Sequence, residues 1–97
     1  MRIQWTSKGS SDLVRLYEHL KPVAPEAAAR DIQQLARAPG QLLDFPRLGK
    51  RLDVYEPRET RRRIVANYKM RYELATGTIF MLRVWFCRDS CSFESET

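Results

Sequence analysis

Hydrophobic positions in the first forty residues follow two different periods, which predict one short strand and two helices. Residues 2–6 alternate between polar and apolar side chains, which is typical of a strand. Residues 11–38 change to helical spacing and are interrupted near Pro22 and Pro25, which predicts an antiparallel helical hairpin. The two apolar stripes of this hairpin are formed by Leu13, Leu16, Tyr17 and Leu20, and by Ala28, Ile32, Leu35 and Ala36.

The boundaries of these elements are set by residues that disfavour regular structure. A serine-rich stretch around Gly9 is expected to end the strand, and Ser11 or Asp12 to cap the first helix. The second helix is expected to end at Pro39. Residues 40–60 then show no clear period, and so long an irregular connection in a small domain favours a functional loop.

Residues 61–88 predict three antiparallel strands, with a turn at residues 75–78 before the last of them. An even-numbered loop would pair Leu74 with Ile79 and mix charged with apolar side chains on both faces. A three-residue loop pairs Leu74 with Phe80 and separates the two kinds of side chain, so we expect this register. It then pairs Tyr72 with Leu82, Met70 with Val84 and Tyr68 with Phe86 on the apolar face, and leaves Lys69, Arg71, Glu73, Met81, Arg83 and Trp85 on the other.

The predicted fold is a small α+β domain with the order strand, helix, helix, strand, strand, strand. We expect one domain over residues 1–97, in which the helical hairpin packs on one face of an antiparallel sheet. The opposite face is basic and carries Trp85, so it is the predicted working face.

Charge is unevenly distributed along the chain. The 97 residues contain 17 Lys and Arg and 12 Asp and Glu, which gives a net charge of +5. Residues 61–88 hold seven basic side chains and one acidic, whereas residues 89–97 form a short acidic tail. Such a basic segment suits a polyanionic partner or a solvated sheet face. Direct nucleic-acid binding is not expected, because the two helices carry balanced charge.

Composition favours a soluble domain with no cofactor. No apolar run approaches the roughly 20 residues of a membrane span, and no signal peptide is recognised, so a cytoplasmic location is expected. Cys87 and Cys91 are spaced C-x3-C without a nearby histidine, which does not match a metal site. We expect them to be thiols near the end of the chain, and the single histidine, His19, to lie on the surface.

Short motifs along nearly the whole chain resemble the RelE/ParE superfamily of toxins from type II toxin–antitoxin modules, and most closely its ParE branch. The order and spacing of these motifs over residues 3–88 carry the resemblance. They are Ile3-Gln4-Trp5-Thr6, Asp12-Leu13 through Tyr17 to Leu20, Pro25-Glu26-Ala27-Ala28, Leu42 through Phe45-Pro46 to Gly49-Lys50, Arg62-Arg63-Ile64-Val65, Asn67-Tyr68, Arg71-Tyr72-Glu73 and Leu82-Arg83-Val84-Trp85.

The resemblance implies a small toxin held inactive by a cognate antitoxin encoded beside it. ParE members poison DNA gyrase, whereas RelE members cut messenger RNA on the ribosome, and the shared fold does not choose between them. In the RelE nucleases the sheet arginine corresponds to Lys69 here, and the arginine after the last strand to Arg88. The Tyr or His that these nucleases use near the C-terminus has no counterpart here, because neither residue type follows Tyr72. The position after Trp85, which is often His in the wider family, is Phe86.

These departures favour a gyrase inhibitor that binds its target and has no catalytic residues. Two alternatives stay open. One is a RelE-type messenger RNA endonuclease that uses clustered cations in place of histidine, for which Lys50, Arg51, Arg61 and Arg62 are candidates. The other is a degenerate, non-toxic module that only binds the antitoxin.

The predicted partner is an acidic, amphipathic antitoxin segment, in a hetero-oligomer of toxin and antitoxin. Cations on the basic face would bind its carboxylates, and neighbouring apolar side chains would anchor it. A second groove is expected on the outer side of the helical hairpin. The candidate antitoxin-binding residues are Arg62, Lys69, Arg71, Met81, Arg83 and Trp85, with Tyr17 and Leu20 on the hairpin. Lys50, Arg51 and Arg88 are the candidates for binding gyrase.

Overall fold

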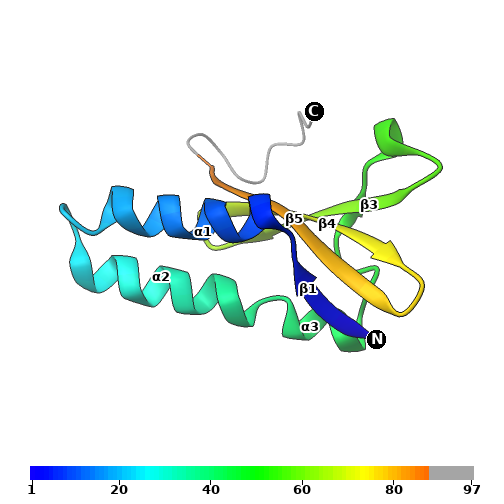
Figure 1. Ribbon diagram of the computed structural model, residues 1–97, viewed down its shortest axis with the longest axis horizontal. Helices are drawn as coiled ribbons and strands as arrows, with labels where there is room; N and C mark the ends of the chain where they lie inside the picture. The colour runs from blue at the N-terminus through cyan, green and yellow to red at the C-terminus, as the bar shows by residue number, and fades with distance from the viewer. Residues whose placement is uncertain (88–97) are drawn as a thin grey trace.

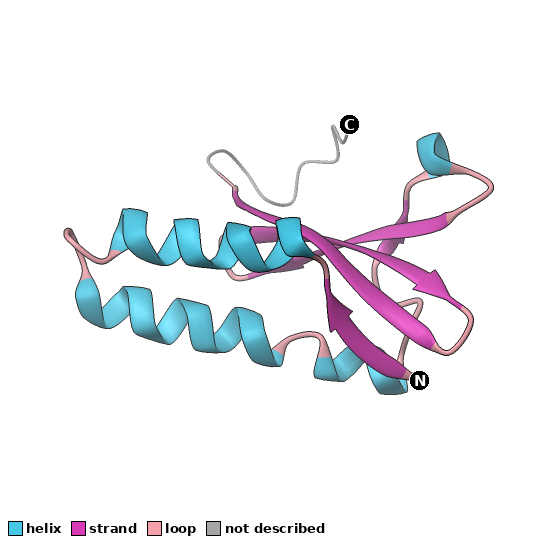
Figure 2. Cartoon of the chain, viewed as in Figure 1, coloured by secondary structure: helices cyan, strands magenta, loops and turns pink. Residues whose placement is uncertain are grey.

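A computed structural model describes residues 1–87 as a five-stranded sheet with helices on one side and along one edge. Figures 1 and 2 show the two long helices side by side, with the sheet extending beyond them. The elements in chain order are β1 (Arg2–Trp5), α1 (Ser7–Leu20), α2 (Pro25–Arg37), α3 (Gly40–Asp44), β2 (Lys50–Arg51), the 3-10 helix η1 (Asp53–Tyr55), β3 (Glu59–Val65), β4 (Tyr68–Ala75) and β5 (Thr78–Phe86).

The sheet has the strand order β1-β5-β4-β3-β2 and is mixed. Strands β3 to β5 pair antiparallel, as expected. The strand β2, which was not predicted, pairs antiparallel with β3, and β1 runs parallel to β5. The segment 40–60 also contains more structure than its irregular pattern predicts, because α3, β2 and η1 all lie in it. The expected α+β class and the order of the main elements are confirmed.

The helix α1 begins earlier than the sequence predicts. Thr6 is its N-cap, and the side-chain oxygen accepts a hydrogen bond from the backbone of Gly9 at 3.1 Å. Gly9 therefore lies inside the helix and does not end the preceding strand. A Cβ atom at this position would lie 2.5 Å from the carbonyl oxygen of Met81, so glycine is required by the close approach of α1 to β5.

The register of the β4–β5 hairpin combines the two alternatives and corrects our expectation. At its tip the loop has two residues, Thr76 and Gly77, and Leu74 faces Ile79. Gly77 has a φ of +74°, which a glycine adopts without strain. A bulge at Leu82 then shifts the register, so that the pairs further from the turn are those expected from a three-residue loop.

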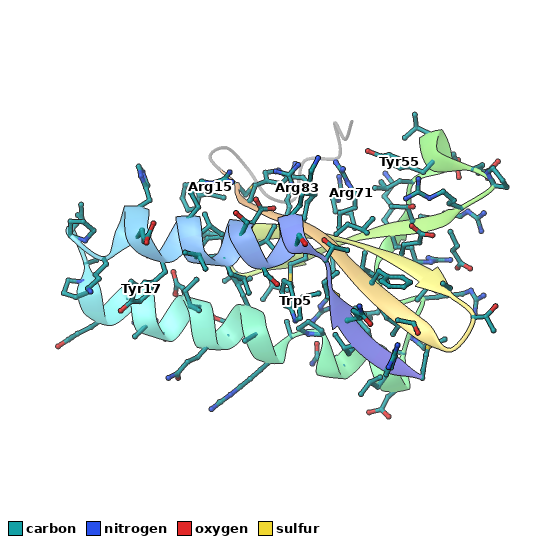
Figure 3. The ribbon with its side chains drawn as sticks, viewed as in Figure 1. Trp5, Arg15, Tyr17, Tyr55, Arg71 and Arg83 are labelled. Atoms are coloured by element: carbon teal, nitrogen blue, oxygen red, sulfur yellow. The ribbon has the colours of Figure 1, made fainter. Side chains whose placement is uncertain are left out.

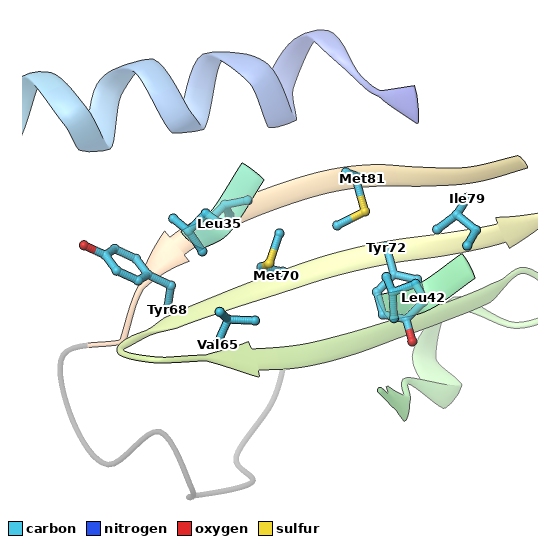
Figure 4. Close-up of a cluster of buried hydrophobic side chains, with 9 residues drawn as sticks. Leu35, Leu42, Val65, Tyr68, Met70, Tyr72, Ile79 and Met81 are labelled. Atoms are coloured by element: carbon cyan, nitrogen blue, oxygen red, sulfur yellow. The ribbon is translucent and has the colours of Figure 1, made fainter. Parts of the chain in front are cut away.

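This bulge allows both ends of β5 to contribute apolar side chains to one face. Met81, expected on the basic face, faces Tyr72 and is completely buried. Helices α2 and α3 cover this face through Leu35 and Leu42, and the resulting core is shown in Figure 4. Its buried members are Leu35, Leu42, Val65, Tyr68, Met70, Tyr72, Ile79, Met81 and Val84.

The connection between α3 and β2 is attached to the sheet by a buried tyrosine. The Tyr72 hydroxyl donates a hydrogen bond to the carbonyl of Pro46 at 2.8 Å and accepts one from the backbone of Gly49 at 2.9 Å. Arg61 donates a further bond to the carbonyl of Gly49 at 2.7 Å. These bonds fix where β2 begins, and therefore where Lys50 is held.

Candidate functional site

The helix α1 lies along β5 where β1 no longer pairs with it. Parallel pairing with β1 ends at Met81, and beyond that residue Asp12 of α1 takes the place of a strand. Its carboxylate accepts a hydrogen bond from the backbone of Val84 at 2.9 Å and two from the guanidinium of Arg83, at 2.8 and 3.3 Å. Asp12 is 4% exposed, so it acts as a buried link between helix and sheet and not as the expected helix cap.

A groove opens between α1 and the ends of β4 and β5, next to this link. It has a volume of about 830 Å³. One wall consists of α1 and the other of the last residues of β5 together with Tyr68. The side chains that line it are Asp12, Arg15, Leu16, His19, Leu20, Tyr68, Arg83, Val84, Trp85 and Phe86. We call this the α1–β5 groove.

The groove brings together candidates that the sequence placed on two separate surfaces. Leu20 comes from the hairpin, and Arg83 and Trp85 come from the basic face, yet all three line one cavity. Tyr17 is not among its lining residues and instead lies under the ammonium group of Lys21, 5.6 Å from the ring centroid. The hydrogen bonds that Arg83 donates to Asp12, together with the negative charge of Asp12, raise the pKa of Arg83 above its usual value, so this side chain stays positively charged.

Arg71 lies between two aromatic rings on the face of the sheet opposite the core. Its guanidinium carbon is 5.1 Å from the centroid of Trp85 and 5.1 Å from that of Tyr55. This arrangement is favourable because each ring presents its electron-rich face to the cation. Figure 3 shows Arg15, Arg83, Arg71 and Tyr55 along one side of the molecule. Residues 40–60 show no period from which the contact of Tyr55 with Arg71 could be predicted.

The remaining cations differ in how accessible they are. Arg62, expected on an open face, is only 3% exposed, and the neighbouring Thr60 is fully buried. Lys69 is half-buried and pairs across the sheet with Trp85. Met81 is in the core and is removed from the candidate binding surface. This face is therefore less open than its charge pattern suggested, and the surface that it offers is centred on Arg71 and Trp85.

The candidates for target binding lie at the far edge of the sheet. Lys50 and Arg51 form β2 and pair with Arg62 and Arg61 of β3. Arg51 is 3.7 Å from the carboxylate of Glu56. The third candidate, Arg88, lies outside the described residues.

Glu59 holds two arginines near this edge. Its carboxylate contacts Arg47 at 2.9 Å and Arg61 at 3.0 Å. Burial raises the pKa of Glu59, but the hydrogen bonds from Arg61 and Arg47 outweigh this effect and lower the pKa overall. The carboxylate therefore stays ionised and keeps both guanidinium groups near the loop that precedes β2.

Other expectations concern metals, thiols and membranes. Cys87 takes part in a disulfide and is not the thiol that we expected, and Cys91 lies outside the described residues. Within residues 1–87, His, Cys, Asp and Glu do not gather in any group of three or more that could hold a metal ion. No helix in the same residues is long and apolar enough to span a membrane.

Comparison with known proteins identifies the family. The sequence model of the ParE toxin of the type II toxin–antitoxin system parDE matches residues 3–90. The chain belongs to the ParE toxin family. Its fold is similar to a chain of the chromosomal ParDE toxin–antitoxin system from P. aeruginosa, with a TM-score of 0.74 and 21% sequence identity. That match covers 89% of this chain and 95% of the other. No curated protein matches the chain at a significant level.

Proposed function

We propose that this ParE-family chain inhibits DNA gyrase by binding it, and that a cognate antitoxin neutralises it by binding the α1–β5 groove. The observation that carries the proposal is the family match over residues 3–90, which spans every described helix and strand from Ile3 onward. The geometry of the basic face supports binding without catalysis.

Cleavage of RNA through the 2′-hydroxyl requires a general base and a general acid within hydrogen-bond reach of the reacting atoms. The carboxylate of Glu73 lies on the same face as Arg71, but Arg58 donates two hydrogen bonds to one of its oxygens, at 2.7 and 3.2 Å. That bidentate pair favours a structural role for Glu73. Lys69 supplies a charge in place of the arginine fork of the nucleases, and this supports an inhibitor over a ribonuclease.

The α1–β5 groove has the chemistry that an acidic amphipathic antitoxin segment requires. Leu16, Leu20 and Phe86 provide apolar area along it. Arg15 lies at its rim with a side chain that is 71% exposed, and Arg83 lies beside it. An antitoxin helix with one apolar stripe and flanking carboxylates would bury the first and form charge-assisted hydrogen bonds with the second.

The Arg71–Trp85 pair would extend this docking surface over the sheet. Trp85 lines the groove and also contacts Arg71, so it joins the groove to the basic face. A tryptophan held against a cation loses little side-chain freedom on binding, which favours it as an anchor. We propose Arg71, Arg83, Trp85 and Leu20 as the main antitoxin contacts, with Lys69 beside them.

The β2 edge would then stay available for the target. We propose that Lys50 and Arg51, with Arg88, contact gyrase, because the first two are exposed and lie at the opposite edge of the sheet from α1. Tyr72 and Arg61 hold the backbone of this segment in place.

The experiment is a gyrase supercoiling and cleavage assay with the purified chain, run in parallel with a cell-free translation reaction. We expect lost supercoiling or accumulated cleaved plasmid, with translation unaffected. The double variant Lys50→Glu/Arg51→Glu should lose most of this inhibition. Its control, Arg2→Glu/Lys8→Glu, makes the same change in charge at other exposed positions and should retain it.

Three outcomes would contradict the proposal in different ways. Cut messenger RNA with unaffected gyrase would assign a ribonuclease function. Inactivity in both assays, with the antitoxin still bound, would assign a non-toxic binding module. Equal loss of inhibition in the two double variants would remove Lys50 and Arg51 from the target surface.

A further inference from the structure

A second cleft lies between α2 and the outer part of β3, away from the α1–β5 groove. It has a volume of about 490 Å³ and shares no lining residue with that groove. Hydrogen-bond donors dominate its walls. Three guanidinium groups and three carboxamides line it: Arg30, Arg37 and Arg63, with Gln33, Gln34 and Gln41. We call it the α2–β3 cleft.

No carboxylate lines the part of this cleft that the structure describes. The nearest on α2, Asp31, accepts a hydrogen bond from the buried Tyr68 at 2.9 Å, and only its other oxygen is near Arg30, at 3.6 Å. Arg37 has no ion pair with any residue in 1–87. Like charges gathered in a concave surface concentrate the potential, and an anion would relieve their repulsion.

Arg63 has donor capacity that the protein does not use. It donates a hydrogen bond to the side chain of Gln41, while its buried Nε–H has no acceptor within residues 1–87. A buried donor without a partner costs free energy, and a movement of the Arg63 guanidinium that brings this N–H to a ligand oxygen in the cleft would remove that cost. Arg63 therefore adds a second, independent observation in favour of an oxygen-rich anion.

The lining selects a duplex phosphate backbone over other polyanions. An acidic peptide normally needs an apolar anchor, and this cleft offers only Ala38 and Val65. Single-stranded nucleic acid is usually held by stacking on aromatic rings, and none lines the cleft within residues 1–87. Arginine and glutamine without aromatic or apolar anchors are typical of contacts to the phosphates of a duplex.

The spacing of the arginines agrees with this ligand. Arg30 and Arg37 are seven residues apart on α2, which separates them by about 10.5 Å along the helix axis. Successive phosphates of one DNA strand rise by about 3.4 Å along the duplex axis, so a helix that lies parallel to this axis would span about three nucleotides over that distance. We propose that the α2–β3 cleft binds the phosphate backbone of duplex DNA without reading its sequence. The proposal goes beyond gyrase inhibition and does not depend on it.

The charge balance of α2 alone did not indicate this site. Arg30 is followed by Asp31, which suggested a neutral helix surface. The fold turns the Asp31 carboxylate toward Tyr68 and adds Arg63 from a strand distant in the sequence.

The test is fluorescence anisotropy with a labelled random-sequence duplex of about 20 base pairs, in the absence of gyrase and antitoxin. Three phosphate contacts predict a slope of about −2.7 for log affinity against log salt concentration. Affinity should therefore fall about 40-fold between 50 and 200 mM salt. Arg37→Gln should make the slope shallower by about 0.9 and weaken binding at low salt.

The control is Arg2→Gln, which makes the same change in charge at an exposed residue outside the cleft and should leave the slope unchanged. Arg63→Gln is a second cleft variant, to be compared after thermal unfolding shows that it is folded. Equal effects of Arg37→Gln and Arg2→Gln would overturn the proposal in favour of non-specific net charge.

Two other ligands complete the test. A single strand of the same length should bind more weakly, and tighter binding of the single strand would overturn the assignment to a duplex. A glutamate-rich peptide that binds more tightly than the duplex and loses affinity in Arg37→Gln would assign the cleft to a protein partner. Because gyrase is absent from this assay, failure here leaves the proposed gyrase inhibition untouched.

Discussion

Asp12 and Arg83, 71 residues apart, form the ion pair that joins α1 to β5, with Arg83 Nε 2.8 Å from the Asp12 carboxylate. The same carboxylate also accepts the backbone N–H of Val84. Asp12 is buried, whereas the side chain of Arg83 is 41% exposed. Arg83 therefore has a structural role in addition to its proposed contact with the antitoxin, and charge reversal at this position is a poor probe of binding.

Removal of either partner should destabilise the fold. Arg83→Gln leaves the buried carboxylate with only the more distant and exposed Arg15, 3.7 Å away, as a cation, and we expect a loss of about 2 kcal/mol in the free energy of unfolding. Asp12→Asn should cost about 1–2 kcal/mol, because its amide oxygen can still accept from Val84. Urea denaturation of the wild type, both single variants and the double variant gives the coupling free energy between Asp12 and Arg83. A coupling free energy below about 0.5 kcal/mol would show that the pair contributes little to stability.

Two glycines should respond differently to replacement by alanine, because only Gly9 lies at the close contact between α1 and β5. Gly9→Ala places a methyl group against the carbonyl of Met81 and should cost about 1–3 kcal/mol. Gly40→Ala, at the start of α3, meets no atom within 4 Å and should be neutral or stabilise the protein by up to about 0.5 kcal/mol. Thermal unfolding would compare them, and equal melting temperatures would refute the close contact.

Trp85 is the side chain on which antitoxin binding should depend most. Trp85→Ala removes an aromatic surface from the groove and the cation–π contact with Arg71, and we expect at least about a fivefold weaker complex. Isothermal titration calorimetry with the cognate antitoxin measures this. Val23→Ala, which trims an apolar side chain that is 83% exposed and outside the groove, is the control. Wild-type affinity of folded Trp85→Ala would remove the groove from the docking surface.

Tyr68 should make stability depend on pH under alkaline conditions. Burial, with the hydrogen bond and negative charge of Asp31, raises the pKa of Tyr68 from 10.0 to about 12. The folded state therefore retains this proton when the unfolded state has lost it. Stability contributed by Tyr68 is complete below pH 10 and is lost as the pH rises toward 12.

Urea denaturation at increasing pH, with and without Tyr68→Phe, tests this effect. The difference in the free energy of unfolding between the two proteins should become smaller above pH 10. Absorbance of tyrosinate should show that the variant has one fewer tyrosine that ionises only well above pH 10. A constant difference across this range would show that Tyr68 titrates normally. Tyr72 is also buried, and its pKa is raised in both proteins, so its contribution cancels.

Periodicity located the two long helices and the three later strands, because their apolar positions recur over several turns or pairs, but it did not locate the start of α1 or the short helix α3. Periodicity failed where one extra residue changes which face of the sheet the following side chains occupy. Leu82 is inserted into β5 as a bulge, so Met81 and Val84 reach the same face although they are three residues apart. No regular alternation describes that strand, and each register considered from the sequence was correct for only part of the hairpin.

The candidate site followed from the sequence only in part. Charge and helical spacing made Leu20, Arg83 and Trp85 candidates, whereas their meeting in one groove, with Arg71 against Trp85, depends on how α1 packs along β5. Asp12 carried a usable signal, since a carboxylate four residues before Leu16 lies on the buried stripe of a helix and must have a partner there. The stacking of Tyr55 on Arg71 depends on tertiary structure and had no local signal.

The bulge at Leu82 also affects when the molecule can assemble during synthesis. It leaves the carbonyls of Met81 and Leu82 in place for the hydroxyl of Thr6, at 3.1 and 3.2 Å, so α1 docks on residues made about 75 positions later. Until β5 has emerged from the ribosome, neither the core nor the groove can close. A partly made chain therefore lacks both the closed core and the α1–β5 groove, and this domain completes its fold only when nearly all of its residues are available.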